Sequence, residues 1–296
     1  MLKYCWDQIK YNRAEYLMDT ISEALDQAIN QFNGLREVEE QGLFEFAHPL
    51  LLAETQAVIK KLPKDGTLID IGTAAGILPH AIHLLGYKVK TIDQSMNGKP
   101  TWGMERAKTL GIETKMATVG KEQVDLPNDI ADVVFAGDVV EHLPDSPRPF
   151  MKKIARVLKP DGWCILTTPN AVRLPVRTKM MLGYSNWMPI KEYFYQDKNL
   201  GHHKEYVASE LFDLLSWSNF KNINYEYVED TLRRVGIAKS LSDIQTKNRH
   251  VGKEIYRKNF DALNYMEYLR IVAVAITAAI PSLRSSIICL SQNTSS

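Results

Sequence analysis

The sequence predicts an α/β fold built on a doubly wound, mostly parallel sheet, and two features of the chain carry this prediction. The first is the stretch from Asp70 to Asp93, in which a short apolar strand is followed by a glycine-containing turn, a helix-like segment and a second apolar strand. The second is the continued alternation of strand-like and helix-like segments as far as residue 228. Because ligands of such sheets bind at the carboxyl ends of the strands, we expect the functional site at that edge.

The individual elements follow from apolar periodicity and from turn residues. Apolar runs bounded by turn signals predict strands at residues 67–71, 88–92, 112–119, 132–136, 163–168 and 223–228. Besides the helix-like stretch that ends at Gly86, helical spacing predicts helices at residues 14–31, 49–61, 146–158 and 210–219. Ser146 and Ser209 are the expected N-caps of the last two helices, because a serine oxygen accepts hydrogen bonds from N–H groups of the first turn.

The composition is that of an ordinary globular chain of 296 residues, long enough for one domain with embellishments. The net charge of +1 argues against the basic field of a nucleic-acid-binding protein, so we expect no DNA partner and no RNA partner. Cys5, Cys164 and Cys289 form no C-x-x-C pair, which is typical of reduced thiols. The first residues are charged and lack an apolar signal core, so we expect a cytoplasmic protein.

The turn after the first strand is suited to a nucleoside ligand. The small residues Gly72, Ala74 and Gly76 let the backbone approach a ligand closely. Asp93 stands at the tip of the second strand, where a carboxylate can accept hydrogen bonds from both hydroxyls of a ribose. The turn departs from the G-x-G-x-x-G pattern that brings a pyrophosphate onto a helix N-terminus, so the residues favour a nucleoside over a dinucleotide.

Four motifs, in a fixed order, resemble those of the class I S-adenosylmethionine-dependent methyltransferases. They are the D-x-G turn at Asp70 and then E-H-L, L-K-P-x-G and T-x-P-N, which stand here as EHL, LKPDG and TTPN between Ala131 and Asn170. The resemblance covers roughly residues 50–230 and departs from the family at Ala74 and Ala75, where a further glycine is usual. It implies a Rossmann-like sheet of seven strands, whose antiparallel last strand would be residues 286–291.

The resemblance also implies S-adenosylmethionine as cofactor and assigns its contacts. Asp70 would lie near the methionine end, the glycine turn would wrap that end, and Asp93 would bind the ribose. Gln94 and the loop at residues 120–125 would lie on the adenine side. The complete set of expected cofactor-binding residues is Asp70, Gly72, Ala74, Gly76, Asp93, Gln94 and Asp138.

A second group of polar residues follows the fourth strand. Asp138, Glu141 and His142 have the spacing i, i+3, i+4, which places them on one face of a helical turn. Two carboxylates and an imidazole form half of a divalent-metal site, and His202 can add a further imidazole from across the site. This arrangement is similar to that of the small-RNA 2′-O-methyltransferases and the ubiquinone-pathway O-methyltransferases. That similarity implies Asp138, Glu141, His142 and His202 as ligands of Mg²⁺ or a similar ion that acidifies the acceptor hydroxyl.

The alternative is a site without a metal. Many relatives carry E-H-L with no ion, and Asp138 is shorter than the glutamate of the metal-using families. In that case His142, His202 or His203 would serve as the general base, because histidine titrates near working pH.

Two further segments are expected to concern the acceptor. Residues 171–201 are rich in aromatic and basic side chains, so this insertion is either a substrate cap or a cover for the core. Residues 233–258 hold eight Lys or Arg against two acids, and residues 271–280 are largely apolar. This pair predicts either a lid or a contact with an anionic membrane surface or a lipid-linked substrate, at the inner face of the membrane. The expected division is an N-terminal helical extension (1–49), the core (50–229), the lid or membrane segment (230–284) and the last strand (285–296).

The resemblance implies transfer of a methyl group to a hydroxyl of a small-molecule or glycan acceptor. The TTPN and GHHKEY segments are similar to those of methyltransferases that modify sugars in polysaccharide or natural-product pathways. A quinone or phenol O-methyltransferase, an N-methyltransferase, an RNA-end methyltransferase and a catalytically silent accessory subunit are the alternatives, and the near-neutral charge argues against the RNA-end enzyme.

Overall fold

The computed structural model describes residues 17–31, 48–94, 99–117, 126–186, 190–195, 201–229, 276–277 and 279–294. These residues contain a seven-stranded sheet with the order β3-β2-β1-β4-β5-β7-β6. Only β7 runs antiparallel to its neighbours. The strands are β1 (Thr67–Ile71), β2 (Lys88–Asp93), β3 (Glu113–Met116), β4 (Ala131–Gly137), β5 (Leu158–Pro169), β6 (Phe220–Val228) and β7 (Ser286–Asn293). The predicted fold class, with its antiparallel last strand, is confirmed.

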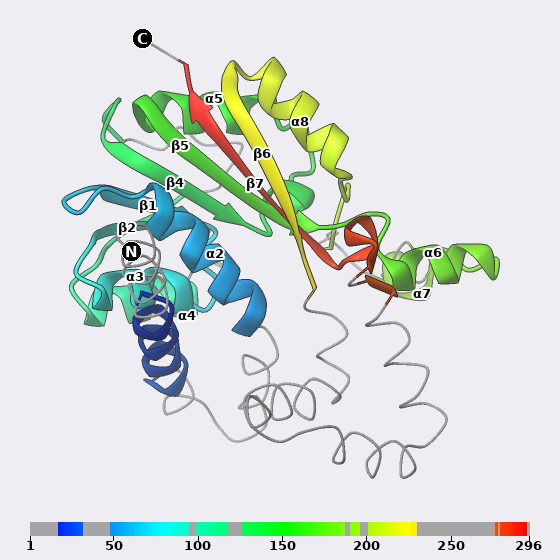
Figure 1. Cartoon of the computed structure of the whole chain (residues 1–296), viewed down its shortest axis with the longest axis horizontal. Helices are drawn as coiled ribbons and strands as arrows, with labels where there is room; N and C mark the ends of the chain where they lie inside the picture. Colours follow the sequence, from blue (N-terminus) through cyan, green and yellow to red (C-terminus); the bar gives the residue numbers. More distant parts are fainter. Residues whose placement is uncertain are drawn as a thin grey trace, which may run out of the picture.

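Helices cover both faces of the sheet (Figure 1). One face carries α2 (His48–Lys61), α3 (Ile77–Leu84) and α4 (Trp102–Thr109), and the other carries α5 (Arg148–Val157) and α8 (Ala208–Trp217). The helical residues 17–31 pack on the first layer through Ile21 and Leu25, which lie in one buried cluster with Ile77 of α3. The predicted N-terminal helix is therefore present from residue 17.

Shorter elements gather near the carboxyl ends of β4 and β5. They are η2 (Val140–His142), α6 (Leu174–Met181), α7 (Ile190–Tyr195) and η4 (Pro281–Leu283). Figure 1 shows α6, α7 and the red segment before β7 together at this end of the sheet. The insertion expected at residues 171–201 thus forms helices beside the edge at which the site was expected.

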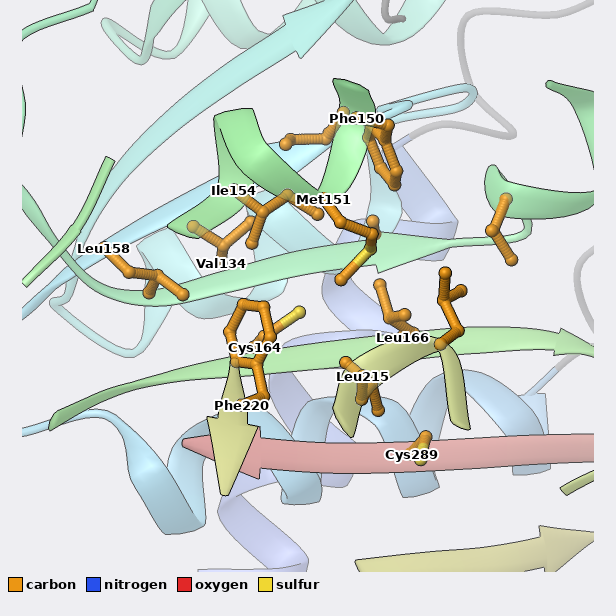
Figure 2. Packing of buried hydrophobic residues seen from close by; sticks show 14 of the residues in the cluster. Val134, Phe150, Met151, Ile154, Leu158, Cys164, Leu166, Leu215, Phe220 and Cys289 are labelled. Atoms are coloured by element: carbon orange, nitrogen blue, oxygen red, sulfur yellow. The ribbon is translucent and has the colours of Figure 1, made fainter. Parts of the chain in front are cut away.

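The core between the sheet and α5 is formed by large apolar side chains. Phe150, Met151 and Ile154 point from α5 towards the sheet, where Val134 and Leu166 lie (Figure 2). All five side chains are at most 1% exposed. Because each such side chain contributes about 1.5–3 kcal/mol when it leaves water, this layer holds α5, and with it the end of β4, in place.

The structure corrects the predicted start of the helix at residues 210–219. The helix α8 already begins at Ala208, so Ser209 is its second residue and not its N-cap. The N–H of Val207 instead donates to the Glu210 carboxylate at 3.0 Å. A glutamate three residues into a helix can satisfy the N–H at the cap position, and here that contact fixes the start of the helix.

The fifth strand is longer than the predicted 163–168. It begins at Leu158, which pairs with Ala131, and the register shifts before Val133 pairs with Trp163. Asp161 takes a positive φ of 61° inside this irregular part. The turn residues at 159–162 therefore form an irregularity within the strand, since the pairing on either side continues across it.

Several predictions concern residues outside the described part of the chain. These are the end of the third strand (118–119), the adenine-side loop (120–125), two aromatic side chains of the insertion at residues 171–201 (Trp187 and Tyr193), the basic stretch (233–258) and most of the apolar run (271–280). In the part that is described, no helix has the length and apolar character needed to cross a bilayer.

We expect the substitution Phe150→Ala to lower the free energy of unfolding by about 3–5 kcal/mol, because it opens a cavity under α5. The same substitution at Phe194, whose side chain is 72% exposed on α7, is the matched control and is expected to change it by less than about 0.5 kcal/mol. Urea denaturation of both variants measures the difference. Equal effects of the two substitutions would contradict the packing described here.

Candidate functional site

The glycine turn after β1 brings two loops into contact. Gly72 has a φ of +80°, and a Cβ at this position would lie 2.4 Å from Cγ2 of Val139 in the loop after β4. Real Cβ atoms do not come this close to another carbon, so only glycine allows both the backbone angle and the contact. Ala74 also has a positive φ, of 45°, at the place where the family usually has a glycine. Alanine thus keeps the turn but holds a left-handed conformation that strains a residue with a Cβ.

The start of α4 packs against the same turn. The Gly103 N–H donates to the Ala74 carbonyl at 2.9 Å. A Cβ on Gly103 would lie 2.5 Å from that carbonyl oxygen, and one on Gly76 would lie 3.0 Å from the Gly103 Cα. Sequence reasoning missed Gly103, although a glycine in the first turn of a helix could have indicated this close approach.

Asp70 lies at the base of the turn and is only 2% exposed. Its Oδ2 accepts a hydrogen bond from the Thr73 hydroxyl at 2.8 Å. Burial, with a smaller contribution from the charge of Asp93, raises the pKa of Asp70 to about 7 against the opposing effect of the Thr73 hydrogen bond. A cationic ligand beside this carboxyl group would favour its ionised form.

Asp93 is buried at the end of β2 and already accepts three hydrogen bonds. Its Oδ2 accepts from the Ala74 N–H at 3.0 Å and from the Thr101 hydroxyl at 2.9 Å. Its Oδ1 accepts from the Gln94 N–H at 2.7 Å. An ionised carboxylate offers about four lone-pair positions, so a ribose that binds through both hydroxyls has to displace one of these donors.

Glu141 is the buried acid of the second group. It is fully buried in η2, and its Oε2 accepts a hydrogen bond from the Thr168 hydroxyl at 3.1 Å. Its Oε1 is also buried and has no hydrogen-bond partner. Burial, together with the charge of Asp138, raises the pKa of Glu141 to about 8. Thr168 belongs to the TTPN motif, and its contact with Glu141 is a role that the sequence did not reveal.

Two imidazoles lie beside Glu141. Ligand atoms of Glu141, His142 and His202 all lie within 4.8 Å of one another, and we call this group the EHH cluster. The two histidine rings meet edge to face, with their centroids 4.7 Å apart. The N–H of His203 donates to the Glu141 carbonyl at 2.7 Å, which attaches the loop at residue 201 to η2. His203 thus contributes its backbone to the site.

The EHH cluster fits a divalent cation. A cation would satisfy Oε1 of Glu141, which otherwise remains buried without a partner. One carboxylate and two imidazoles form a mixed oxygen and nitrogen donor set. This set suits Mn²⁺ or Zn²⁺ better than it suits Mg²⁺, which prefers oxygen ligands alone. The exposed Asp138 is not among the three grouped residues, but its charge raises the pKa of Glu141.

Glu205 lies next to His202 and was not singled out from the sequence. Its Oε1 lies 2.9 Å from Nδ1 of His202, and Arg173 forms a salt bridge to its Oε2 at 2.5 Å. Burial alone would raise the pKa of Glu205, but the hydrogen bonds from His202 and Arg173 outweigh it and lower the pKa to about 2. The hydrogen bond to Glu205 raises the pKa of His202, and the charge of Glu141 adds to this effect. Burial lowers the pKa but does not outweigh them.

The sequence is similar to those of known methyltransferases. Residues 43–225 match a family model described as a methyltransferase domain. A ubiquinone biosynthesis O-methyltransferase of Bradyrhizobium diazoefficiens is 35% identical over 104 residues, which are 35% of this chain and 40% of that protein. One of Paramagnetospirillum magneticum is 28% identical over 170 residues, covering 52% of this chain and 66% of that protein. The match thus spans less than two thirds of either relative.

Among solved structures, the chain is similar to a methyltransferase of Thermotoga maritima described as a possible histamine N-methyltransferase. The TM-score is 0.51 at 15% identity, over 86% of this chain and 95% of that one. This likeness concerns the fold alone. Because the family model covers well over half of the sequence, the chain belongs to the methyltransferase-domain family, and its seven-stranded sheet has the fold of class I S-adenosylmethionine-dependent methyltransferases.

Proposed function

We propose that this protein transfers a methyl group from S-adenosylmethionine to a hydroxyl oxygen of a small-molecule acceptor, with a divalent ion at the EHH cluster. The observation that carries the proposal is the EHH cluster itself, in which a buried carboxylate oxygen without a partner lies beside two imidazoles. It stands at the end of β4, and Val139 of the same loop touches the glycine turn expected to hold the cofactor.

The cofactor part of the proposal assigns a charge role to Asp70. The cofactor carries positive charge on its ammonium and sulfonium groups, and a buried acid with a pKa near 7 can pair with such a ligand when it gives up its proton. Asp93 would accept from the ribose hydroxyls, with Thr101 or Ala74 releasing its hydrogen bond. Gln94 and Asp138 remain proposed cofactor contacts.

The chemical step requires in-line approach of the acceptor oxygen and the loss of its proton. A divalent ion would lower the pKa of the acceptor hydroxyl and so make its proton easier to remove. Glu141, His142 and His202 would hold that ion, with Asp138 beside them, and the Thr168 hydroxyl holds Glu141 in position. In a site without an ion, His142, His202 or His203 would take the proton.

For the acceptor, we place a phenolic hydroxyl of the quinone-precursor type ahead of a sugar hydroxyl. Support comes from the two relatives above, whose names are those of ubiquinone biosynthesis O-methyltransferases. The sugar acceptor stays a prediction from the TTPN and GHHKEY segments. The retained EHH cluster favours an enzyme over a silent accessory subunit.

We expect the purified protein to bind S-adenosylhomocysteine and not NAD in calorimetry. The substitution Asp93→Ala removes the acceptor for the ribose and should weaken binding by about 1–3 kcal/mol. Asp213→Ala, an exposed position on α8, is the matched control and should leave affinity unchanged. Binding of NAD, or unchanged affinity in the Asp93 variant, would contradict the cofactor assignment.

We expect the protein to bind Mn²⁺ saturably, as followed by electron paramagnetic resonance of the free ion. Glu141→Gln keeps the side-chain shape but removes the charge, so it should weaken this binding at least tenfold while cofactor affinity survives. Glu113→Gln, on an exposed acid of β3, is the control. Absence of saturable Mn²⁺ binding to the unsubstituted protein, together with full turnover in excess chelator, would leave the histidines as bases.

The raised pKa of Asp70 predicts a pH dependence of stability. A carboxyl group whose pKa rises from 3.8 to about 7 on folding holds its proton better in the folded state, so stability falls as pH rises through that window. We expect the unfolding free energy of the ligand-free protein to drop by roughly 2–4 kcal/mol more than that of Asp70→Asn between pH 4 and 7.5. Urea denaturation measures both proteins. Parallel pH profiles would show that Asp70 titrates normally.

A further inference from the structure

His202 is held by a carboxylate at one of its two ring nitrogens. Its Nδ1 lies 2.9 Å from Oε1 of Glu205. Because a carboxylate only accepts hydrogen bonds, Nδ1 must carry the proton in this contact. In the neutral imidazole the lone pair then belongs to Nε2, the form in which a histidine can bind a cation through that nitrogen.

Besides its contact with His202, Glu205 is held by Arg173 and Asn186. Arg173 donates from Nη1 to Oε2 at 2.5 Å and from Nη2 to Oε1 at 3.1 Å, which is the paired geometry of guanidinium and carboxylate. The Asn186 amide donates to Oε2 at 3.3 Å. The side chains of Arg173 and Glu205 are only 19% and 13% exposed, so both groups are largely removed from water.

Arg173 is in turn anchored to the main chain at the end of β5. Its Nη1 also donates to the Asn170 carbonyl at 3.0 Å, and its own N–H donates to the same oxygen at 3.1 Å. Arg173 directly precedes α6, the first helix of the insertion. The path from His202 through Glu205 to Arg173 therefore joins the EHH cluster to the base of the proposed acceptor cap.

We infer that Glu205, held by Arg173, is a positioning residue that fixes the orientation and the tautomer of His202. The inference rests on the proposed function, because it assumes that His202 is a ligand of the ion. Glu205 touches neither cofactor nor acceptor in this assignment and acts through His202 alone. A salt bridge with a merely structural role would stabilise the loop at residue 201 without any effect on which imidazole nitrogen carries the proton.

The test compares Glu205→Gln with the unsubstituted full-length protein. An amide can turn its NH₂ group towards Nδ1, so the variant no longer enforces a proton on that nitrogen. Nitrogen NMR of ¹⁵N-histidine protein, without metal and at pH 9, reports the tautomer, and the His202 signals are assigned with His202→Gln. We expect the Nδ1–H form to dominate in the unsubstituted protein and to lose that dominance in Glu205→Gln. Mn²⁺ affinity should fall by about 10–100-fold.

Glu210→Gln is the matched control, because Glu210 pairs with Lys204 and the Val207 N–H rather than with His202. It should change neither the tautomer nor Mn²⁺ affinity. Arg173→Lys provides a milder second variant should Glu205→Gln fail to fold, and its expected effects are in the same direction but smaller. Circular dichroism and S-adenosylhomocysteine affinity report whether each variant is folded.

The outcomes separate the inference from the proposed function. A folded Glu205→Gln protein with unchanged His202 signals and Mn²⁺ affinity within twofold would overturn the inference while the proposed function stands. If the unsubstituted protein binds no Mn²⁺, the metal part of the proposed function fails. The tautomer comparison then still decides whether Glu205 positions His202.

Discussion

The close packing of the loops after β1 and β4 depends on the absence of a side chain at residue 72. A Cβ there would lie 2.4 Å from Cγ2 of Val139, so a larger residue would force the Val139 side chain or the turn to move. Neighbouring parallel strands already bring their carboxyl ends to one edge, and β1 and β4 are hydrogen-bonded neighbours. The missing methyl group turns this proximity into contact. As a result, the turn that follows Asp70 and the loop that carries Glu141 pack against each other.

Two acids at this contact between the loops are buried without a full set of hydrogen-bond donors. Asp70 has one side-chain hydrogen bond, and Glu141 keeps one oxygen without any. Burying a carboxylate in this way destabilises its charged form, which is why both pKa values rise towards or above neutrality. Ligands with positive charge would relieve this penalty. The fold thus holds two positions whose electrostatics favour cations, one beside the glycine turn and one beside the histidines.

Local patterns in the sequence were sufficient to predict the positions of the first six strands, the glycine turn and the spacing that groups Glu141 with His142, whereas the seventh strand was expected from the family resemblance. What they could not supply depends on contacts between distant segments. The salt bridge of Arg173 and Glu205 joins positions 32 residues apart, and no spacing in the sequence links the two residues. The hydrogen bond from the Thr101 hydroxyl to Asp93 likewise depends on how the start of α4 packs, which apolar periodicity does not fix. Ser209 shows that local sequence alone does not fix where a helix begins. Serine and a nearby glutamate can both satisfy helix N–H groups, and only the tertiary structure selects between them.

The two ends of the chain between β6 and β7 are tied to each other where they join the sheet. The Ser285 hydroxyl donates to the Val228 carbonyl at 3.1 Å, and the Asn170 amide donates to the carbonyls of Ser282 and Arg284 at 2.9 and 2.8 Å. The segment that leaves the sheet at Val228 and returns at Ser285 therefore has its two ends side by side. The entropy of closing such a loop grows only with the logarithm of its length. The length of this segment can therefore change at little thermodynamic expense, without any need to move the two strands between which it is inserted.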